Sequence, residues 1–323
     1  MLPCFRYGKV AAPMKLYAPA FYPDFHCIAN RCRHTCCAGW EIDIDPDALA
    51  LYQSLPGAIG DRLRGNIDIT KDGACFRLAE NERCPMLNEN GLCDLITACG
   101  EEALCQICAD HPRFRSFFSD RTEIGLGLCC EAAARLTLFQ QAPMRLILLE
   151  DDSIEDAPDP EEQALLDFRD QLFTMAQRRD APLANRLRGI VGVVGLTPVT
   201  FDRHAVADFL LTLERLDEAW TALLLQLRDA PKVPLLAAKW DVPMEQLLCY
   251  LLYRHLPGAL ENGLPQERTA MCLLLVEVVR QLFALQGGNE MEKLTEICRC
   301  MSAEIEYDAE NVDALLAFLR GIC

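Results

Sequence analysis

Cysteine is the residue type in this sequence that is best suited to chemistry. Four cysteines fall within eleven residues near the start of the chain, with a histidine between them: Cys27, Cys32, Cys36 and Cys37. Thiolate sulfur is a soft ligand, and several thiolates can surround one Zn²⁺ ion or one iron–sulfur cluster. A run this dense predicts either a metal site or a set of disulfides.

Further cysteines supply enough ligands for such a site. The Asn90-Gly91 pair predicts a tight turn, which brings Cys84 and Cys93 toward the same end of a hairpin. Some thiols of this region can instead be buried as small apolar side chains, and four are weaker candidates: Cys75, Cys99, Cys105 and Cys129. The candidate metal ligands are eight residues: Cys27, Cys32, Cys36, Cys37, Cys84, Cys93, Cys108 and Cys130.

Composition limits the compartment and the class of partner. The chain has 323 residues, 18 of them cysteine, and a formal net charge of −17. This charge argues against a nucleic acid as the main partner, since phosphate binding requires clustered Lys and Arg. No signal peptide and no run of roughly 18 apolar residues is evident, which predicts a cytoplasmic protein without a membrane span. In that reducing compartment, dense cysteines favour metal over disulfides.

The distribution of cysteine predicts two parts, because 13 of the 18 cysteines precede Glu131. Residues 1–149 are expected to form a cysteine-rich metal-binding domain with short extended pieces, and residues 1–13 to be an extension of it. Residues 150–162 are acidic and contain prolines, so they can bury little and are expected to form a linker. Residues 163–323 are expected to form an all-α helical bundle, which makes the predicted fold class mainly α.

Local patterns predict the individual elements. Residues 40–45 alternate apolar and acidic side chains as a short strand does, and Pro46 begins a helix. A helix is expected from about residue 94 to 109, with a weak point at Gly100. The glycines of residues 189–195 lack the context of a nucleotide-binding loop and predict a tight helix contact or a turn. Apolar periodicity predicts about six helices in the second part: 161–179, 201–227, 244–256, 265–285, 290–305 and 309–319.

Three motifs of the first part carry a resemblance to a known family. They are Cys27-x4-Cys32-x3-Cys36-Cys37-x2-Trp40, Arg83-Cys84-Pro-Met-Leu-Asn-x-x-Gly-Leu-Cys93-Asp, and Gly100-Glu-Glu-Ala-Leu-Cys105-x2-Cys108-x3-Pro112-Arg113-Phe114. Together with the stretch from Glu123 to Leu136, they resemble the flagellin lysine-N-methylase family. The resemblance covers roughly residues 14–140. It extends more distantly to small cysteine-cluster proteins that chelate zinc or iron.

Two positions depart from what that family and its chemistry would suggest. The Cys-x3-Cys-x2-Cys signature of radical S-adenosylmethionine enzymes is incomplete, because Gly39 stands where its third cysteine belongs. Position 131 is Glu where a proline would be expected after the family cysteine.

The resemblance implies a protein-lysine N-methyltransferase that uses S-adenosylmethionine and a cysteine-bound iron–sulfur cluster of the 4Fe–4S type. Its substrate would be flagellin or another lysine-bearing protein, and the eight cysteines would be the cluster ligands, with zinc as the alternative metal. Trp40 and Arg113 lie in the matching motifs and are candidates for contacts with the cofactor. Four acidic residues are candidates for accepting the lysine proton or holding the cationic substrate: Asp43, Asp45, Asp110 and Glu131.

A second class of function is compatible with the same residues. In this alternative the protein is not an enzyme. Zinc or an iron–sulfur cluster holds together a small domain, and the helical domain binds a partner.

Overall fold

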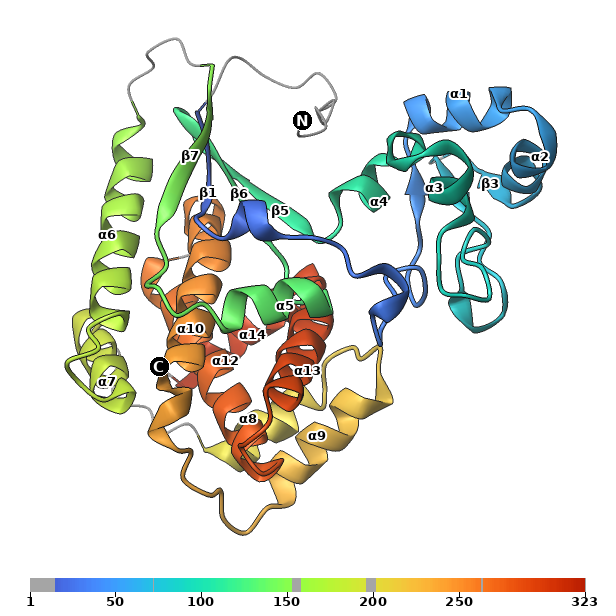
Figure 1. Ribbon diagram of the computed structural model, residues 1–323. Coiled ribbons are helices and arrows are strands. Elements are labelled where there is room, and N and C mark those ends of the chain that lie inside the picture. The colour runs from blue at the N-terminus through green and yellow to red at the C-terminus, as the bar shows by residue number, and fades with distance from the viewer. Residues whose placement is uncertain (1–14, 72, 153–157, 196–201, 263, 323) are drawn as a thin grey trace.

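The computed structural model describes residues 15–71, 73–152, 158–195, 202–262 and 264–322 (Figure 1). The predicted extension at residues 1–13, residues 153–157 of the predicted linker, Cys4 and Cys323 lie outside the described residues. Helices predominate in the described chain, which confirms the predicted mainly α class. Among these residues, no helix is both long and apolar enough to cross a membrane.

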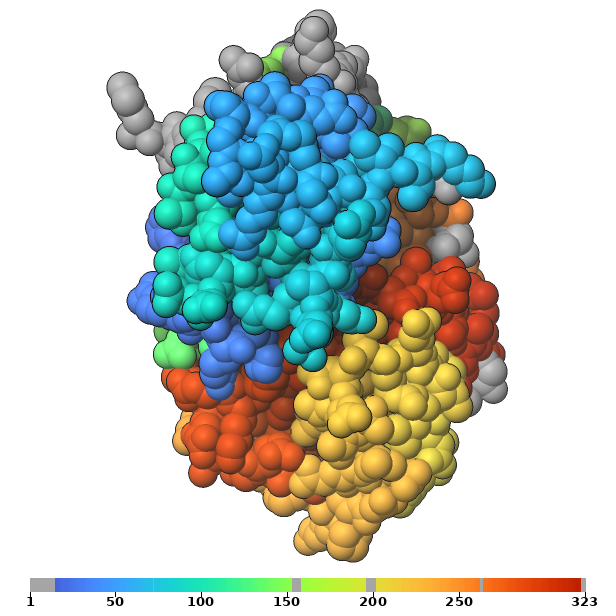
Figure 2. Space-filling model, turned by 90° about the vertical axis from the view of Figure 1, so that its right-hand side faces the viewer, coloured from blue at the N-terminus to red at the C-terminus, as the bar shows by residue number. Residues whose placement is uncertain are grey.

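A small lobe, here called the cysteine-rich lobe (residues 37–110), stands to one side of the molecule (Figure 1) and covers the upper part of the face seen in Figure 2. Its short strands form an antiparallel sheet in the order β2-β4-β3. Tyr52, Leu63 and Met86 lie in its own hydrophobic core. The elements of the lobe are β2 (Asp43–Ile44), α1 (Pro46–Ser54), α2 (Gly57–Gly65), β3 (Ile67–Ile69), β4 (Ala74–Phe76), α3 (Asp94–Cys99) and α4 (Gln106–Asp110).

The lobe confirms the predicted strand and helix start but not the predicted helix over 94–109. Helix α1 begins at Pro46, with the Asp45 side chain accepting a hydrogen bond from the amide of Ala48. The expected single helix is broken into α3 and α4. Gly100 has φ of +90°, which ends α3, because a residue in that conformation cannot continue a right-handed helix.

A second sheet belongs to the larger part of the molecule. Its strand order is β5-β6-β1-β7, with β1 parallel to β6 and antiparallel to β7. Part of the predicted linker is therefore a strand. The helix that follows β6 is α5, and it packs on the core of the helical part. Buried in that core are Ala134 and Leu138 of α5 and Leu128 just before it. These elements are β1 (Lys15–Pro19), β5 (Arg113–Phe117), β6 (Arg121–Leu126), α5 (Glu131–Leu138) and β7 (Leu146–Asp151).

The helical part has more helices than the roughly six predicted. The predicted helix over 201–227 is wrong, because the chain turns between α8 and α9, where Asp217 caps the second helix by accepting a hydrogen bond from the amide of Ala219. The helices are α6 (Pro160–Ala176), α7 (Leu183–Val193), α8 (Arg203–Leu210), α9 (Glu218–Asp229), α10 (Asp241–His255), α11 (Ala259–Asn262), α12 (Pro265–Leu285), α13 (Met291–Met301) and α14 (Ala309–Ile322).

The glycine-rich stretch 189–195 contains both a helix end and a turn, since Gly195 has φ of +68° just after α7; the sequence predicted a tight helix contact or a turn. It lies mostly in α7, and a side chain at Gly189 would come within 3.3 Å of Met175 in α6. Glycine therefore leaves room for the flexible end of the Met175 side chain.

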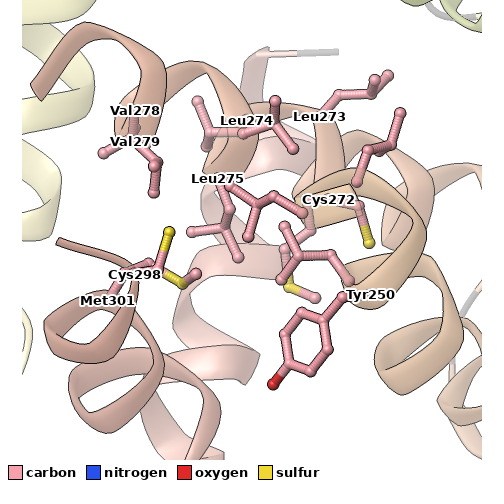
Figure 3. Packing of buried hydrophobic residues seen from close by; sticks show 14 of the residues in the cluster. Tyr250, Cys272, Leu273, Leu274, Leu275, Val278, Val279, Cys298 and Met301 are labelled. Carbon is pink, nitrogen blue, oxygen red and sulfur yellow. The ribbon is translucent and has the colours of Figure 1, made fainter. Parts of the chain in front are cut away.

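The centre of the helical part is formed by α10 and α12, whose side chains are mostly buried. Tyr250, Cys272, Cys298 and Met301 pack together there (Figure 3). The thiols of these helices, Cys249 included, are buried among apolar side chains, as expected for cysteines that act as small apolar residues.

Candidate metal centre

Every described cysteine is a free thiol, sixteen in all. Eight of them are the predicted metal ligands, and each of the eight lies in one of two neighbouring sets. One set lies inside the cysteine-rich lobe, and the other lies where the chain leading to the lobe passes the start of α5.

The lobe set consists of five thiols on three short segments: Cys37, Cys84, Cys93, Cys105 and Cys108. The amide of Cys84 donates a 2.8 Å hydrogen bond to the carbonyl oxygen of Cys37. A β-bridge pairs Leu87 with Cys93, and Gly91 has φ of +73° in the turn between them. The predicted turn is therefore confirmed, and it places Cys93 beside Leu87, three residues after Cys84.

Electrostatics shows that the thiols of the lobe set are neighbours. Burial raises the pKa of Cys84 to about 11, and charges on Cys37 and Cys93 would raise it further. The thiol of Cys108 donates a hydrogen bond to Cys105, which raises the pKa of Cys108, and burial and the nearby Cys37 and Cys84 act in the same direction. Sequence reasoning ranked Cys105 low, although it is buried in this group.

The junction set consists of four thiols: Cys27, Cys32, Cys36 and Cys130. The Cys32 thiol lies 2.9 Å from the carbonyl oxygen of His34 and 3.8 Å from a carboxylate oxygen of Glu131. The same carboxylate accepts hydrogen bonds from the amide and the guanidinium of Arg33, at 2.9 and 3.0 Å. Glu131 therefore fastens the segment that carries Cys32 to the start of α5.

Mutual effects on pKa also connect the junction set. Burial raises the pKa of Cys130 to about 11, and charges on Cys32 and Cys27 would act in the same direction. Cys36 keeps its proton because it donates a hydrogen bond to Cys37, and burial, Cys27 and Cys130 raise its pKa as well.

The two sets meet at the adjacent residues Cys36 and Cys37. The hydrogen bond from the Cys36 thiol lowers the pKa of Cys37 to about 7, and the Thr35 hydroxyl and Arg83 act in the same direction against burial. Cys37 is thus the thiol of this pair that is ready to be a thiolate near neutral pH.

The surroundings of several sulfurs fit a metal or cluster. The Cys27 sulfur accepts a hydrogen bond from the amide of Ala29 at 3.3 Å, and the Cys84 sulfur accepts one from the amide of Met86 at 3.5 Å. The sulfurs of Cys93 and Cys130 each accept such bonds from the amides two and three residues ahead. Amide hydrogen bonds stabilise the anionic sulfur that a metal needs, and they tune iron–sulfur clusters in the same way.

The eight candidate thiols do not surround a common point in this structure. In the part of the chain that the structure describes, no three His, Cys, Asp or Glu side chains stand where one metal ion could contact them all. Ligation therefore requires the thiols to turn toward a shared centre, and the metal site stays a prediction that the donor chemistry supports.

Three of the four predicted acidic residues have structural partners: Asp45, Asp110 and, as described above, Glu131. The carboxylate of Asp45 caps α1 and accepts a 2.7 Å hydrogen bond from the amide of Gln106 at the start of α4. Asp110 is held by Arg115 at 2.8 Å and by the side chain of Gln106 at 2.6 Å. Asp43 is exposed on β2. Of the four predicted acids, Glu131 is the one in contact with a candidate ligand.

The two predicted cofactor contacts are both neighbours of His111. The indole of Trp40 donates a 2.8 Å hydrogen bond to the carbonyl oxygen of Cys36, and its ring stacks on His111. Burial and Arg113 lower the pKa of His111 to about 4, so this imidazole is neutral at pH 7. Arg113 donates a 2.9 Å hydrogen bond to the Tyr22 hydroxyl. Trp40 thus positions Cys36, and Arg113 binds an aromatic neighbour.

A cavity of about 550 Å³ that the sequence did not reveal lies between β5 and the helical part. Buried Glu306 accepts hydrogen bonds from His255 at 2.7 Å and Tyr250 at 2.9 Å. The guanidinium of Arg254 lies 4.4 Å from the centre of the Tyr307 ring. Tyr307 also shares a hydrogen bond with Cys129, so this residue connects the cavity to the segment carrying Cys130.

The cavity residues come from several elements that are remote in sequence, and each of them reads locally as part of an ordinary helix. No sequence signal identified them.

The fold and the site define a class: a mainly helical protein with a small lobe and two neighbouring sets of free thiols. Its sequence is similar to the lysine-N-methylases of Salmonella choleraesuis (strain SC-B67), at 30% identity, and Salmonella typhimurium (strain LT2), at 29%. Each similarity extends over 125 residues and covers 36% of this chain and 31% of the relative. The flagellar biosynthetic protein FliU of Salmonella muenchen is 29% identical over 125 residues, which cover 36% of this chain and 74% of FliU.

The chain is therefore a distant relative of the lysine-N-methylases, as its motifs predicted, and it spans about a third of the length of the two relatives that carry that name. No protein-family model matches the sequence. No solved structure matches it.

Proposed function

We propose that this protein is a cytoplasmic methyltransferase that transfers the methyl group of S-adenosylmethionine to a lysine side chain of flagellin or another flagellar protein. We further propose that its cysteines hold an iron–sulfur cluster. The observation that carries the activity is the similarity to two proteins named lysine-N-methylase. The gathering of eight predicted thiols into neighbouring sets supports the cluster.

A bound cluster would supply an iron position that could hold the amino and carboxylate groups of the methyl donor. The chain itself must handle the substrate. A lysine ammonium has to lose its proton before its nitrogen can act as a nucleophile. Glu131, beside Cys32 and Arg33, is the predicted acid placed to hold that ammonium or accept its proton.

The cavity supports a place for the methyl donor. Its volume of about 550 Å³ is in the usual range of small-molecule sites. Side chains of both signs line it, with Arg254 and Arg268 opposed by Glu261 and Asp313.

Mass spectrometry of flagellin tests the proposal. Purified protein, flagellin, S-adenosylmethionine and a reductant are incubated without oxygen, and methyl groups on lysine are counted. We expect methylated lysine with the unaltered protein and with Cys75→Ser, because Cys75 belongs to neither thiol set. We expect loss of methylation with Cys130→Ser. Absence of lysine methylation with metal-loaded protein contradicts the proposal.

One observation favours the non-catalytic alternative for part of the site. The lobe set lies within a separate hydrophobic core, which is where a structural zinc would hold a small domain together. A colourless protein with stoichiometric zinc and no iron or sulfide would support that alternative.

A further inference from the structure

The cavity between β5 and the helical part has a lining rich in buried positive charge. Three arginine side chains with little exposure line it: Arg115, Arg254 and Arg268. Arg268 is 7% exposed. A cation in such surroundings costs free energy unless an anion lies near it. The positions of the acidic side chains therefore decide what the cavity can bind.

Arg115 and Arg254 are each held by a carboxylate of the protein. Arg115 donates a 2.8 Å hydrogen bond to Asp110. The Nε atom of Arg254 lies 3.6 Å from a carboxylate oxygen of buried Glu306, and the same guanidinium donates a 3.2 Å hydrogen bond to the Tyr250 hydroxyl. These two cations therefore belong to the internal structure of the cavity wall.

The acids near Arg268 are placed differently. Glu261 and Asp313 also line the cavity, but both are exposed to solvent. Water weakens the effect of exposed charges. Burial lowers the pKa of Arg268, although these two acids act in the opposite direction. An anion inside the cavity would therefore stabilise the Arg268 cation further.

Gly258 leaves the room that the Arg268 guanidinium occupies. A Cβ atom at Gly258 would stand 2.5 Å from the Cζ atom of Arg268 and 2.6 Å from its Nη1 atom. Gly258 ends a short helical turn (Leu256–Gly258), so its backbone conformation does not require glycine. Space requires it. The guanidinium lies against the backbone here, and a single methyl group would displace it from its place in the cavity lining.

A second glycine gives room to the aromatic part of the lining. A Cβ atom at Gly127 would collide with the Tyr307 hydroxyl and lie 2.9 Å from Nη1 of Arg254. The Arg254 guanidinium lies 4.4 Å from the centre of the Tyr307 ring and 4.8 Å from that of Phe114. Contacts with both rings hold this cation in place. It contributes fixed positive charge to the cavity.

We propose that this cavity binds a small molecule through an anionic group, a carboxylate or a phosphate, which Arg268 contacts directly and whose charge Arg254 also offsets. The inference goes beyond the proposed function, because it holds whether the anionic group belongs to the methyl donor or to another small molecule.

The chemistry of the lining agrees with such a ligand. A guanidinium offers two parallel N–H donors that match the oxygens of a carboxylate or a phosphate. These hydrogen bonds are stronger where water is partly excluded. The volume of about 550 Å³ is far larger than a bare anion needs, so the site has room for an organic molecule that carries the anionic group.

Calorimetric titration of full-length protein tests the inference with three probes: S-adenosylmethionine, its decarboxylated analogue and inorganic phosphate. The variants are Arg268→Gln, which removes the charge, and Gly258→Ala, which keeps the charge and displaces the guanidinium. The matched control is Arg280→Gln, because Arg280 lies on the same helix α12 but pairs with Glu277 outside the cavity.

We expect S-adenosylmethionine or phosphate to bind with a Kd below about 1 mM. Arg268→Gln and Gly258→Ala should each weaken this binding by about tenfold or more, as expected for loss of hydrogen bonds to a charged group, and Arg280→Gln should leave it unchanged. Weak binding of the decarboxylated analogue identifies the carboxylate of the methyl donor as the group that is bound. Binding of phosphate without S-adenosylmethionine identifies a phosphate-bearing ligand.

Two results overturn the proposal. One is that neither S-adenosylmethionine nor phosphate binds, and the other is that the probe that binds has the same affinity for Gly258→Ala as for the unaltered protein. Gly258→Ala decides the question if Arg268→Gln fails to fold, because a methyl group there displaces the end of a flexible side chain. The titrations contain no flagellin, so failure of this proposal and failure of methyl transfer are distinguishable.

Discussion

The amide of Cys84 donates a 2.8 Å hydrogen bond to the carbonyl oxygen of Cys37 and so joins two candidate ligands that are distant in sequence. The neighbouring residues Ala38 and Arg83 form a β-bridge. The backbone of the lobe thus places these thiols, and a metal bound by them would in turn hold the backbone segments together. Metal binding and folding of the lobe should be coupled.

Removal of metal should loosen the lobe before the helical part. Without bound metal, we expect amide hydrogen exchange in residues 37–110 to accelerate by about tenfold or more, because a local opening that is 1.4 kcal/mol easier has that effect. The helices α10 and α12 form a separate core and should keep their protection. Exchange measured by mass spectrometry checks this, and equal acceleration in both parts would contradict it.

Asp45 should contribute to stability rather than to proton transfer. Its carboxylate accepts hydrogen bonds from the amides of Ala48 and Gln106 and so holds the starts of α1 and α4. We expect Asp45→Ala to lower the free energy of unfolding by about 1–2 kcal/mol, the usual cost of a lost helix cap.

The exposed Asp43, two residues earlier on β2, is the matched control for Asp45. Asp43→Ala should change the free energy of unfolding by less than about 0.5 kcal/mol. Urea denaturation measures both variants, and equal losses would show that the capping bonds of Asp45 are unimportant.

Glu131 should matter for methyl transfer more than for stability. Arg33 is half exposed, so its ion pair with Glu131 should contribute no more than about 1 kcal/mol. We expect Glu131→Gln to reduce the rate of lysine methylation by about tenfold or more, because a neutral amide can neither hold the substrate ammonium strongly nor accept its proton.

Glu292→Gln provides the comparison. Glu292, on α13, forms an exposed ion pair with Arg135, which lies on the same helix as Glu131. Its methylation rate should match that of the unaltered protein. A Glu131→Gln protein with an unchanged rate would remove Glu131 from the proposed chemistry.

Turns and helix starts could be predicted from the sequence, because residues that are adjacent in the chain determine them. The Asn90-Gly91 turn predicted the approach of Cys84 and Cys93, and the proline at position 46 marked the start of α1. Asp45 was assigned to proton transfer, although an acid just before Pro46 is also a typical helix cap. The turn between α8 and α9 was missed, because a continuous pattern of leucines concealed the cap at Asp217.

The cavity was beyond sequence reasoning for a different reason. Arg254 and Glu306 lie on separate elements and meet through tertiary packing alone. The same holds for the division of the thiols, because the neighbours of Cys36 and Cys37 include residues far along the chain, Cys130 and Cys84 among them. Spacing identified these residues as candidate ligands but could not assign them to sets.

The buried pair of Glu123 and Arg169 should be essential for docking the larger sheet on α6. Both side chains are almost fully buried, and their two hydrogen bonds measure 2.6 and 2.7 Å. We expect Glu123→Gln to lower the free energy of unfolding by about 3–5 kcal/mol, because it leaves the Arg169 cation buried without its counter-charge.

A double replacement distinguishes this cause from loss of packing. Glu123→Gln combined with Arg169→Met removes the uncompensated charge and should regain part of the lost stability. Thermal or urea unfolding measures all three proteins. If the double variant has a lower free energy of unfolding than Glu123→Gln, the uncompensated charge is not the cause of the lost stability.

The network around Glu306 should make stability depend on acid pH. Burial would raise the pKa of Glu306, but Arg254 and His255 lower it from the ordinary value of 4.5 to about 2. Because the folded-state pKa is depressed, this carboxylate stabilises the fold above pH 4.5, and the contribution is lost as pH falls from 4.5 through 2. A shift of this size corresponds to about 3 kcal/mol.

His255 also makes the folded protein less stable as pH falls, but in a higher pH range than Glu306. Burial lowers its pKa below the ordinary value of 6.5, so below that pH the unfolded chain binds a proton that the folded chain does not, and stability falls. In Glu306→Gln the carboxylate contribution is absent at every pH. The difference in unfolding free energy between the unaltered protein and this variant should therefore be largest near pH 7 and shrink as pH falls below 4.5. Urea unfolding at several pH values measures it, and a constant difference would show that Glu306 is not ionised in the folded protein.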